Sequence, residues 1–254
     1  MLFDSHAHID DNRFDTDRDE TIQRAVQNGV KGIINIGADM ASSARSVELA
    51  SRYEEIYAAV GIHPHDAKDA IDSDYEMMAR WVAKEPKIVA IGEIGLDYYY
   101  DWSPRDVQQA VFIRQIDLAR QLGKPIIIHD RDAHGDLLTI VKKEAQGMTG
   151  VFHCFSGSLE MAQEVIRLGF YVSFAGPVTF DKSVKVKEIA AAVPLDRLLV
   201  ETDSPYLTPN PYRGRRNEPA HVRFVAEEIA RLRNLPLEAV AEATTANVRQ
   251  LFRI

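Results

Sequence analysis

The residues of this sequence that are best suited to chemistry are histidines and carboxylates. The stretch DSHAHID, residues 4–10, places His6 and His8 on either side of one alanine, with Asp4 and Asp10 as flanking carboxylates. Residues two apart on a β-strand project to the same side, so both imidazoles can face one point. The pair therefore suggests two ligands of a metal ion; the alternative is a solvated polar segment.

The same residue types recur along the chain, each at the end of a short apolar run. They are His63, Glu93, His129, His153 and Asp203. A single histidine on an apolar strand is more often a hydrogen-bonded core residue than a ligand. Burying unpaired polar groups costs free energy, however, so a whole set of histidines and carboxylates at equivalent places favours one shared metal site.

Eight apolar runs can position these residues. Their apolar positions are continuous rather than alternating, which is typical of parallel strands buried on both faces. The predicted strands span residues 2–9, 31–37, 56–64, 87–95, 124–130, 149–155, 170–176 and 196–203.

Helical patterns lie between these runs. The clearest begins at Ser103-Pro104, where serine can cap the helix, and ends at Gly123. Others cover residues 17–29, end at Leu168-Gly169, and extend from about Pro219 to the C-terminus.

Strands alternating with helices predict an α/β fold: a (β/α)8 TIM barrel, residues 1–254 forming a single domain with C-terminal helices. An open doubly wound sheet is the alternative, but the glycine-rich phosphate motif is missing after the first strand. In a barrel the carboxyl ends of the strands meet at one mouth, where active sites are built.

Imidazole mixed with carboxylate suits zinc, manganese, cobalt or iron, whereas magnesium prefers oxygen ligands. The donors exceed what one tetrahedral ion needs, so we expect two divalent ions, with magnesium, manganese and zinc as the candidates. His6, His8 and Asp203 would hold one ion, and His129 and His153 the other, with Glu93 between them. His63 and His65, in GIHPH, are left to bind substrate, unless they are exposed imidazoles of a rigid turn at Pro64.

Composition limits the remaining possibilities. The net charge is −8 and there is one cysteine, Cys154. This balance argues against broad non-specific nucleic-acid binding, and a lone cysteine excludes an internal disulfide and suits a reducing cytosol. No run is long enough to cross a membrane and no secretory signal is evident. We expect a cytoplasmic protein without an obligate protein partner.

Several motifs together resemble the TatD-like metal-dependent deoxyribonucleases of the amidohydrolase superfamily. In chain order they are DSHAHID, GIHPHDAK, GEIGLDYY, PIIIHDRDA, VFHCFSG, GPVTF, ETDSPYL, YRGRRNEP and TTANVRQLF. The resemblance covers essentially the whole chain. It implies hydrolysis of DNA phosphodiester bonds on single strands or ends, with metal ligands at His6, His8, Glu93, His129, His153 and Asp203, and Glu93 as the bridge.

The remaining site residues are hypotheses. Asp203 would accept the proton of the attacking water, which makes it and Glu93 the catalytic pair. Arg131 and the loop arginines Arg213 and Arg215, next to Arg216, would bind phosphate; the alternative is a solvated loop paired with acids such as Glu218.

Residues beside the ligands have supporting roles in this interpretation. Asp4 and Glu201 lie two residues before ligands and would hold them in place, or form structural ion pairs. Cys154 would pack away from the site. The tyrosines at 98–100 would stack bases or pack at the barrel rim.

Other functions would use the same metal pair. They are hydrolysis of a small-molecule amide or lactone, and hydrolysis of an aminoacyl-tRNA ester. A non-enzymatic metal-binding scaffold is disfavoured, because a structural zinc site is normally closed with four ligands.

Overall fold

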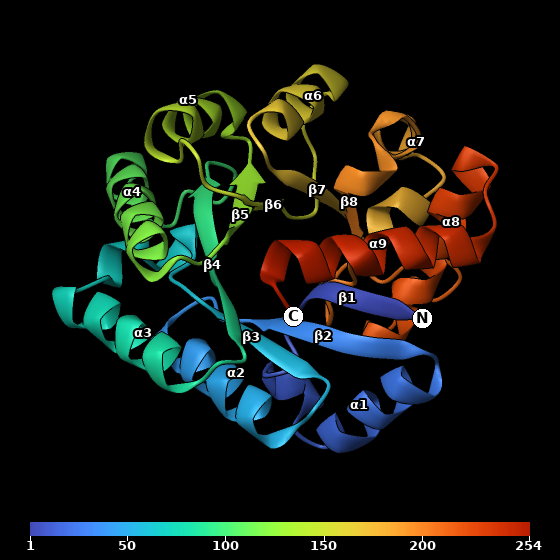
Figure 1. The fold of residues 1–254 in the computed structure, drawn as a ribbon, viewed down its shortest axis with the longest axis horizontal. Helices are drawn as coiled ribbons and strands as arrows, with labels where there is room; N and C mark the ends of the chain where they lie inside the picture. The colour runs from blue at the N-terminus through green and yellow to red at the C-terminus, as the bar shows by residue number, and fades with distance from the viewer.

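The computed structural model describes all 254 residues. Eight parallel strands form one sheet in chain order, which confirms the predicted (β/α)8 barrel and excludes the reordered strands of an open doubly wound sheet (Figure 1). The strands are β1 (Leu2–Ala7), β2 (Val30–Ile36), β3 (Ile56–Val60), β4 (Ile88–Asp97), β5 (Ile126–Arg131), β6 (Gly150–Phe152), β7 (Tyr171–Phe174) and β8 (Leu198–Val200).

The sheet closes between β1 and the segment that follows β8. Ala7 forms a parallel bridge with Ser204. The His8 amide donates to the Ser204 carbonyl at 2.7 Å, and the Asp203 amide donates to the His6 carbonyl at 2.9 Å. This seam joins the first and last predicted ligands, which are far apart in the sequence.

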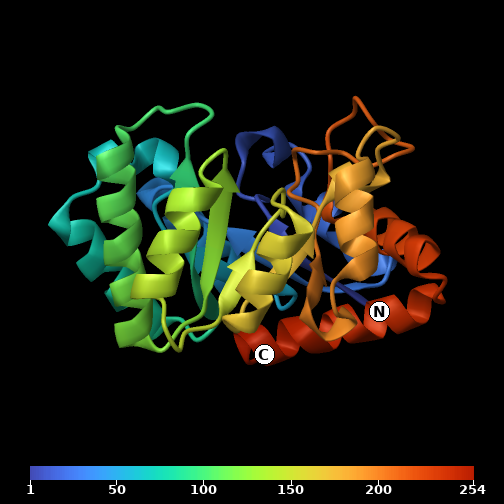
Figure 2. The same ribbon diagram turned by 90° about the horizontal axis from the view of Figure 1, so that it is seen from above.

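Eight helices surround the barrel and a ninth crosses its amino-terminal end (Figures 1 and 2). They are α1 (Arg18–Gln27), α2 (Met40–Arg52), α3 (Asp72–Lys84), α4 (Arg105–Leu122), α5 (His134–Glu144), α6 (Leu159–Arg167), α7 (Val184–Ala192), α8 (Val222–Arg233) and α9 (Leu237–Phe252). Short 3-10 segments are η1 (Asn12–Phe14), η2 (Pro64–Asp69), η3 (Gly176–Thr179), η4 (Leu195–Arg197) and η5 (Pro219–His221).

The barrel interior has an apolar layer beneath a polar one. Ile127, Val151 and Leu199 belong to an apolar cluster that α9 covers with Val248, Leu251 and Phe252. Each of these strand residues lies two positions before a polar residue, namely His129, His153 and Glu201. Because alternate strand residues share a face, the polar layer stands above the apolar one, at the carboxyl ends of the strands.

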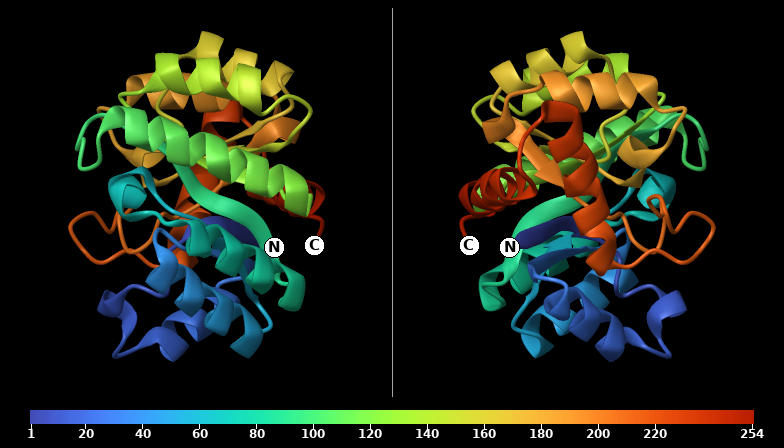
Figure 3. Two further views of the ribbon diagram at one scale, coloured as in Figure 1. Left: turned by 90° about the vertical axis from the view of Figure 1, so that its left-hand side faces the viewer. Right: turned by 90° about the vertical axis from the view of Figure 1, so that its right-hand side faces the viewer.

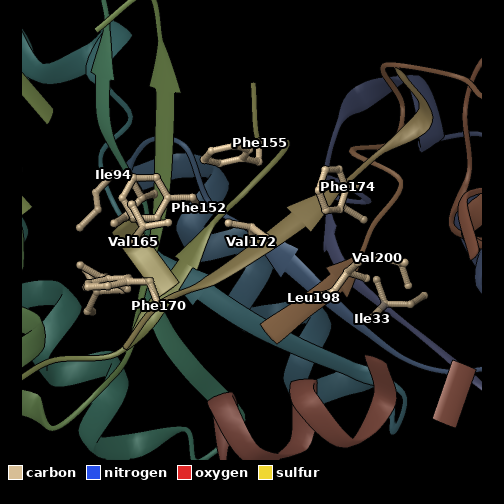
Figure 4. Close-up of a cluster of buried hydrophobic side chains, with 14 of the residues drawn as sticks. Ile33, Ile94, Phe152, Phe155, Val165, Phe170, Val172, Phe174, Leu198 and Val200 are labelled. Atoms are coloured by element: carbon tan, nitrogen blue, oxygen red, sulfur yellow. The ribbon is translucent and has the colours of Figure 1, made fainter. Parts of the chain in front are cut away.

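A larger apolar cluster lies between the sheet and the surrounding helices. Figure 4 shows part of it, where Phe152, Val172 and Leu198 project from neighbouring strands. The two clusters explain why the strand runs are continuously apolar, since each strand is buried on both faces.

The connections at the carboxyl ends of the strands are the longer ones. Figures 2 and 3 show the β4–α4 loop and the segment between β8 and α8 projecting at the end opposite α9. Active sites of such barrels are built on this end.

Several predicted boundaries need correction. β3, β6 and β8 stop before His63, His153 and Asp203, which therefore lie just beyond their strands. Ser103 does not cap α4; its hydroxyl instead donates to the His65 carbonyl and accepts from the Lys68 amide. Gly123 does end α4 in the left-handed conformation, as predicted.

None of the helices has the length and apolar character needed to cross a membrane.

Candidate metal centre

The structure gathers the other five predicted ligands around the carboxylate of the sixth, Glu93. This side chain is almost fully buried within β4, which continues four residues past it to Asp97, so Glu93 does not end its strand as predicted. Its Oε2 lies 3.3 Å from His6 Nε2 and 3.8 Å from His8 Nε2. Its Oε1 lies 2.6 Å from His129 Nδ1 and 2.7 Å from His153 Nε2. The two oxygens thus face two different sets of imidazoles.

Asp203 completes the first set. Its Oδ1 is 3.5 Å from His8 Nε2 and 3.7 Å from His6 Nε2. Ligand atoms of His6, His8 and Asp203 all lie close enough together to hold one ion, and so do those of His6, Glu93 and His153.

Hydrogen bonds behind the ligands fix which imidazole nitrogen faces the centre. His8 Nδ1 lies 2.9 Å from the Ile36 carbonyl and must donate to it, which leaves the lone pair of a neutral ring on Nε2. His129 Nε2 lies 3.2 Å from Asp97 Oδ2, so its Nδ1 carries the inward lone pair.

This donor set fits divalent cations. The lone pair of His8 Nε2 faces the Asp203 carboxylate and His6 Nε2, the latter at 3.3 Å. Likewise, the lone pair of His129 Nδ1 faces Glu93 and His153 Nε2, the latter at 3.3 Å. Buried acceptors that point at one another need a proton or a cation between them.

The pKa shifts of the site residues also favour a bound cation. Burial opposes the charged form of His8, but its hydrogen bond to Asp203 and the nearby carboxylates raise the pKa to about 9. Burial likewise opposes ionisation of Glu93, yet the neighbouring His153 and the hydrogen bonds from His129 and His153 hold its pKa well below the usual range. Ionised carboxylates therefore attract positive charge here, and a divalent ion can replace the bound protons.

A close backbone approach brings His129 to Glu93. Gly95 on β4 has φ +146°, and a Cβ there would lie 2.0 Å from the His129 carbonyl oxygen. Only glycine permits this approach between β4 and β5.

Glu201 lies behind His153, where the sequence predicted a supporting role. It accepts a hydrogen bond from the Cys154 amide at 2.8 Å and another from the Ser173 hydroxyl. Its Oε1 is 3.3 Å from His153 Nδ1, without the geometry of a hydrogen bond. Glu201 therefore positions the backbone of the turn that carries His153 rather than the His153 imidazole.

Asp4 acts on the backbone rather than on a ligand side chain. It accepts hydrogen bonds from the Thr202 amide at 2.9 Å and the Thr202 hydroxyl at 2.6 Å, and from the His6 amide at 3.3 Å. Burial raises the pKa of Asp4 to about 8. Asp10 lies outside the centre, where it accepts from Asn35 and pairs with Arg45.

His63 reaches the centre with a different chemistry from the ligands. Its Nε2 is 3.6 Å from Glu93 Oε1, while its Nδ1 accepts a hydrogen bond from the His65 amide. Burial, and then the neighbouring His129, lower its pKa well below the ordinary value, so the ring is neutral. The proton then sits on Nε2, which makes His63 a hydrogen-bond donor at the centre. His65 is one step removed, with Nε2 2.8 Å from Asp97 Oδ2.

The predicted phosphate-binding arginines divide into free and paired side chains. Arg131, Arg213 and Arg215 are exposed and lie over aromatic rings, without a carboxylate partner. Arg216 is different, because it forms a bidentate ion pair with Asp17. Glu218, the expected partner of this loop, pairs instead with Arg24 of α1.

Sequence reasoning missed Asp97. This residue ends β4, is fully buried, and contacts both His129 and His65. Its signal is its position four residues after Glu93 on the same strand, which places both carboxylates on one face.

A surface cavity of about 420 Å³ lies elsewhere, beside α1 and α2. Its lining includes Asp10, Arg18, Arg45 and Arg52, and each arginine pairs with a carboxylate. It lacks the facing acceptors of the Glu93 centre.

Comparison with known proteins agrees with these observations. Residues 3–253 match the model of the family described as TatD related DNase. The chain is 49% identical to the uncharacterized metal-dependent hydrolase YabD of Bacillus subtilis, over 100% of both chains. It is 35% identical to the 3'-5' ssDNA/RNA exonuclease TatD of Klebsiella pneumoniae, over 100% of this chain and 98% of that one.

The fold comparison is equally close. The crystal structure of YjjV, a TatD homologue from Escherichia coli, superposes with a TM-score of 0.93 at 33% identity, covering 100% of this chain and 98% of the other. The resemblance predicted from the motifs is therefore confirmed, and the chain belongs to the TatD family of metal-dependent hydrolases.

Proposed function

We propose that this protein hydrolyses phosphodiester bonds of single-stranded nucleic acid, with two divalent ions held on either side of Glu93. The single observation that carries the proposal is the placement of the Glu93 oxygens. Oε2 faces His6 and His8, and Oε1 faces His129 and His153. A carboxylate that presents separate oxygens to two donor sets is suited to bridge two ions.

Ions at these positions would lower the pKa of a water molecule and neutralise charge on the phosphate oxygens. Asp203 would accept the proton of the attacking water. Burial opposes its charged form, but the hydrogen bond with His8 and the neighbouring imidazoles together lower its pKa, which keeps it ionised. His63 would donate from Nε2 to a phosphoryl oxygen, because its neutral ring carries its proton there.

Substrate charge favours phosphodiesters over neutral amides. Arg131, Arg213 and Arg215 have no carboxylate partner; Arg131 ends β5, and the other two lie in the segment between β8 and α8 that projects at the mouth of the barrel. A guanidinium binds phosphate with two parallel hydrogen bonds. The name of the Klebsiella relative, a 3'-5' ssDNA/RNA exonuclease, supports the same substrate class. Hydrolysis of a small-molecule amide or lactone, or of an aminoacyl-tRNA ester, remains the competing prediction.

The test removes bound metal with a chelator and adds back magnesium, manganese or zinc. Each form is offered single-stranded DNA, single-stranded RNA, a chromogenic phosphodiester, a simple amide and an aminoacyl ester. We expect turnover of the nucleic acids and the phosphodiester, and about two equivalents of metal per chain by elemental analysis. Amide or ester turnover without phosphodiester turnover would overturn the proposal.

Variants assign the roles. Asp203→Asn should remove most phosphodiesterase turnover while the fold, measured by circular dichroism, stays intact. Asp106→Asn is a matched control, because Asp106 is an exposed carboxylate in the first turn of α4. Wild-type cleavage by Asp203→Asn would show that Asp203 is not the base.

A further inference from the structure

Exposed aromatic side chains gather around the metal centre. The four most exposed aromatic residues are Tyr99, Tyr100, Trp102 and Tyr206, between 44% and 59% accessible. Three of them lie within one four-residue stretch of the β4–α4 loop, and the fourth follows β8. Both segments project at the carboxyl ends of the strands (Figure 2). Exposed apolar surface confined to one site marks a binding surface.

Three of the four aromatic residues of the β4–α4 loop, Tyr99, Tyr100 and Trp102, form a continuous ledge. The ring centroids of Tyr99 and Tyr100 are 4.9 Å apart, and those of Tyr100 and Trp102 are 5.0 Å apart. Tyr98 does not belong to this aromatic ledge. Its hydroxyl bonds Asp136 and Gln109 and its ring lies under Arg105, so it packs at the rim.

Ring contacts connect the aromatic ledge to the metal centre. Trp102 lies 4.4 Å from His65, which lies 4.2 Å from His63, measured between ring centroids. His63 in turn lies 4.4 Å from His129. Only the side chains of His65 and His63 therefore separate Trp102 of the ledge from His129 of the centre along this series of contacts.

The loop that carries the ledge is held rigidly. Asp97 Oδ1 accepts hydrogen bonds from the amides of Tyr99 at 3.0 Å and Tyr100 at 2.9 Å. The buried Ser103 hydroxyl donates to the His65 carbonyl, and Lys68 donates to the Trp102 carbonyl. Hydrogen bonds thus fix the backbone of the loop while its rings remain exposed, which lowers the entropy cost of binding a ligand on them.

A free positive charge lies on the ledge. The guanidinium of Arg131 is 4.0 Å from the Tyr99 ring and 4.7 Å from the Tyr100 ring. Stacking on two rings orients this cation, and no carboxylate neutralises it. The rings of the ledge are edge-on or tilted to one another, at 86° between Tyr99 and Tyr100 and 42° between Tyr100 and Trp102. Exposed aromatic rings beside an unpaired arginine match a nucleotide, which has a planar base next to a phosphate.

We propose that Tyr99, Tyr100 and Trp102 form a stacking subsite for an unpaired nucleobase next to the phosphodiester that is cleaved, with Arg131 on a neighbouring phosphate. The inference rests on the proposed function and refines it. Unpaired bases can leave their own stack for a protein ring, whereas a base of a duplex must first be unpaired, which costs free energy. The subsite therefore selects single strands, DNA and RNA alike, because every base offers a π face.

Trp102 provides a direct measure of stacking. The chain has two tryptophans, and Trp81→Phe leaves Trp102 as the only one. In metal-free protein, where no cleavage occurs, we expect oligothymidylate and oligouridylate to quench the Trp102 fluorescence. An oligonucleotide of equal length with abasic sites should require an about tenfold higher concentration for the same quenching, because it lacks the energy of one base–ring stack.

Activity with metal restored tests the same contact. Trp102→Ala should raise KM for oligothymidylate about tenfold with little change in kcat. With the abasic substrate, wild type and Trp102→Ala should have the same KM, because the ring has no base to contact. Leu235→Ala is the control; Leu235 is exposed and lies between α8 and α9, away from the centre.

The outcomes separate this inference from the proposed function. Equal quenching by abasic and normal strands, or an equal KM increase on both for Trp102→Ala, would refute the subsite. If cleavage persists in that case, the proposed function stands alone. Base-dependent quenching without cleavage by any metal form would support the subsite and refute the phosphodiesterase. Quenching by only one of the two nucleic acids would contradict the shared base chemistry.

Discussion

Two carboxylates on one face of β4 organise this centre. Glu93 faces both donor sets, and Asp97 joins the imidazole of His129 to the loop of the aromatic ledge. One oxygen of Asp97 accepts from two backbone amides and the other faces His65 and His129. Asp97 therefore positions the metal centre and the ledge together.

Asp97→Asn should lower metal affinity. An amide nitrogen in place of Oδ2 would face the N–H groups of His65 and His129, so His129 would lose the partner that fixes its tautomer. Loss of such a partner costs about 10–100-fold in metal affinity. Calorimetric titration of the metal-free variant measures this, with Asp106→Asn as control. Unchanged affinity would show that Asp97 does not orient His129.

Cys154 should be dispensable and chemically inert. Burial raises the pKa of its thiol well above the ordinary range, so the reactive thiolate is absent at pH 8. Its link to the centre is the backbone amide bound to Glu201. We expect Cys154→Ala to keep kcat within about twofold of wild type, and the folded wild type to resist a thiol reagent that labels the unfolded chain. Rapid labelling or a lost turnover would contradict this.

At this scale, residue type and position sufficed to predict that these six side chains gather at the carboxyl ends of the strands; that they bind metal stays a prediction. Asp97 was missed because an aspartate before three tyrosines also fits an ordinary loop. Ser103 was misassigned as a cap because its hydroxyl has a long-range partner, the His65 carbonyl, that local patterns do not reveal.

Ion pairs connect the arginine loop after β8 to helix α1. Arg216 forms a bidentate pair with Asp17, and Arg24 bonds both Asp17 and Glu218. These contacts hold the loop and leave Arg213 and Arg215 free. The sequence indicated a charged loop, but which arginine is paired depends on the docking of α1 against it.

Asp17→Asn should weaken the ion pairs that hold the arginine loop against α1, and the size of this effect should depend on pH. The hydrogen bond with Arg216 holds the pKa of Asp17 below its usual range. The stabilisation is therefore fully present above the carboxyl's ordinary pKa, about 4, and is lost progressively as the pH falls from there towards the lowered pKa of the folded state. Because the pair is partly exposed, we expect a loss of about 1 kcal/mol or less at pH 7.

Thermal unfolding at pH 7 and pH 3 measures this effect. The difference in Tm between wild type and Asp17→Asn should shrink at pH 3. Asp15→Asn, which removes the more exposed partner of Arg18, serves as control. A Tm difference that is constant with pH would show that the charge of Asp17 does not stabilise the fold.

Helix α9 closes the barrel at the end remote from the centre. Phe252, Leu251 and Val248 cover the inner apolar cluster and are almost fully buried. Phe252→Ala should destabilise the fold by about 3–5 kcal/mol through lost burial and a cavity. Urea unfolding measures the change, and Leu235→Ala is the exposed control. A change below about 1 kcal/mol would mean that the helix is not part of the cooperative unit.

The whole molecule combines an acidic surface with a mouth that carries unpaired arginines. The sequence predicted the barrel well, because continuous apolar runs alternating with helices leave few other arrangements. It could not predict how the closing seam joins the His6 and Asp203 segments, since no local pattern encodes the Ala7–Ser204 bridge. The net charge of −8 also does not predict the local electrostatic field at the mouth of the barrel.

The salt dependence of nucleic-acid binding should be determined by the arginines at the mouth of the barrel rather than by the net charge of the protein. If Arg131, Arg213 and Arg215 each neutralise one phosphate of a single strand, the logarithm of the association constant falls with the logarithm of salt concentration with a slope of about −2. Metal-free protein and fluorescent oligothymidylate isolate this contribution. Replacing the three arginines by alanine should bring the slope close to zero, whereas Arg249→Ala, on α9 at the opposite end, should leave it unchanged. If the triple variant keeps the wild-type slope, the nucleic acid binds to another surface. If the wild-type slope is itself close to zero, these arginines do not bind phosphate.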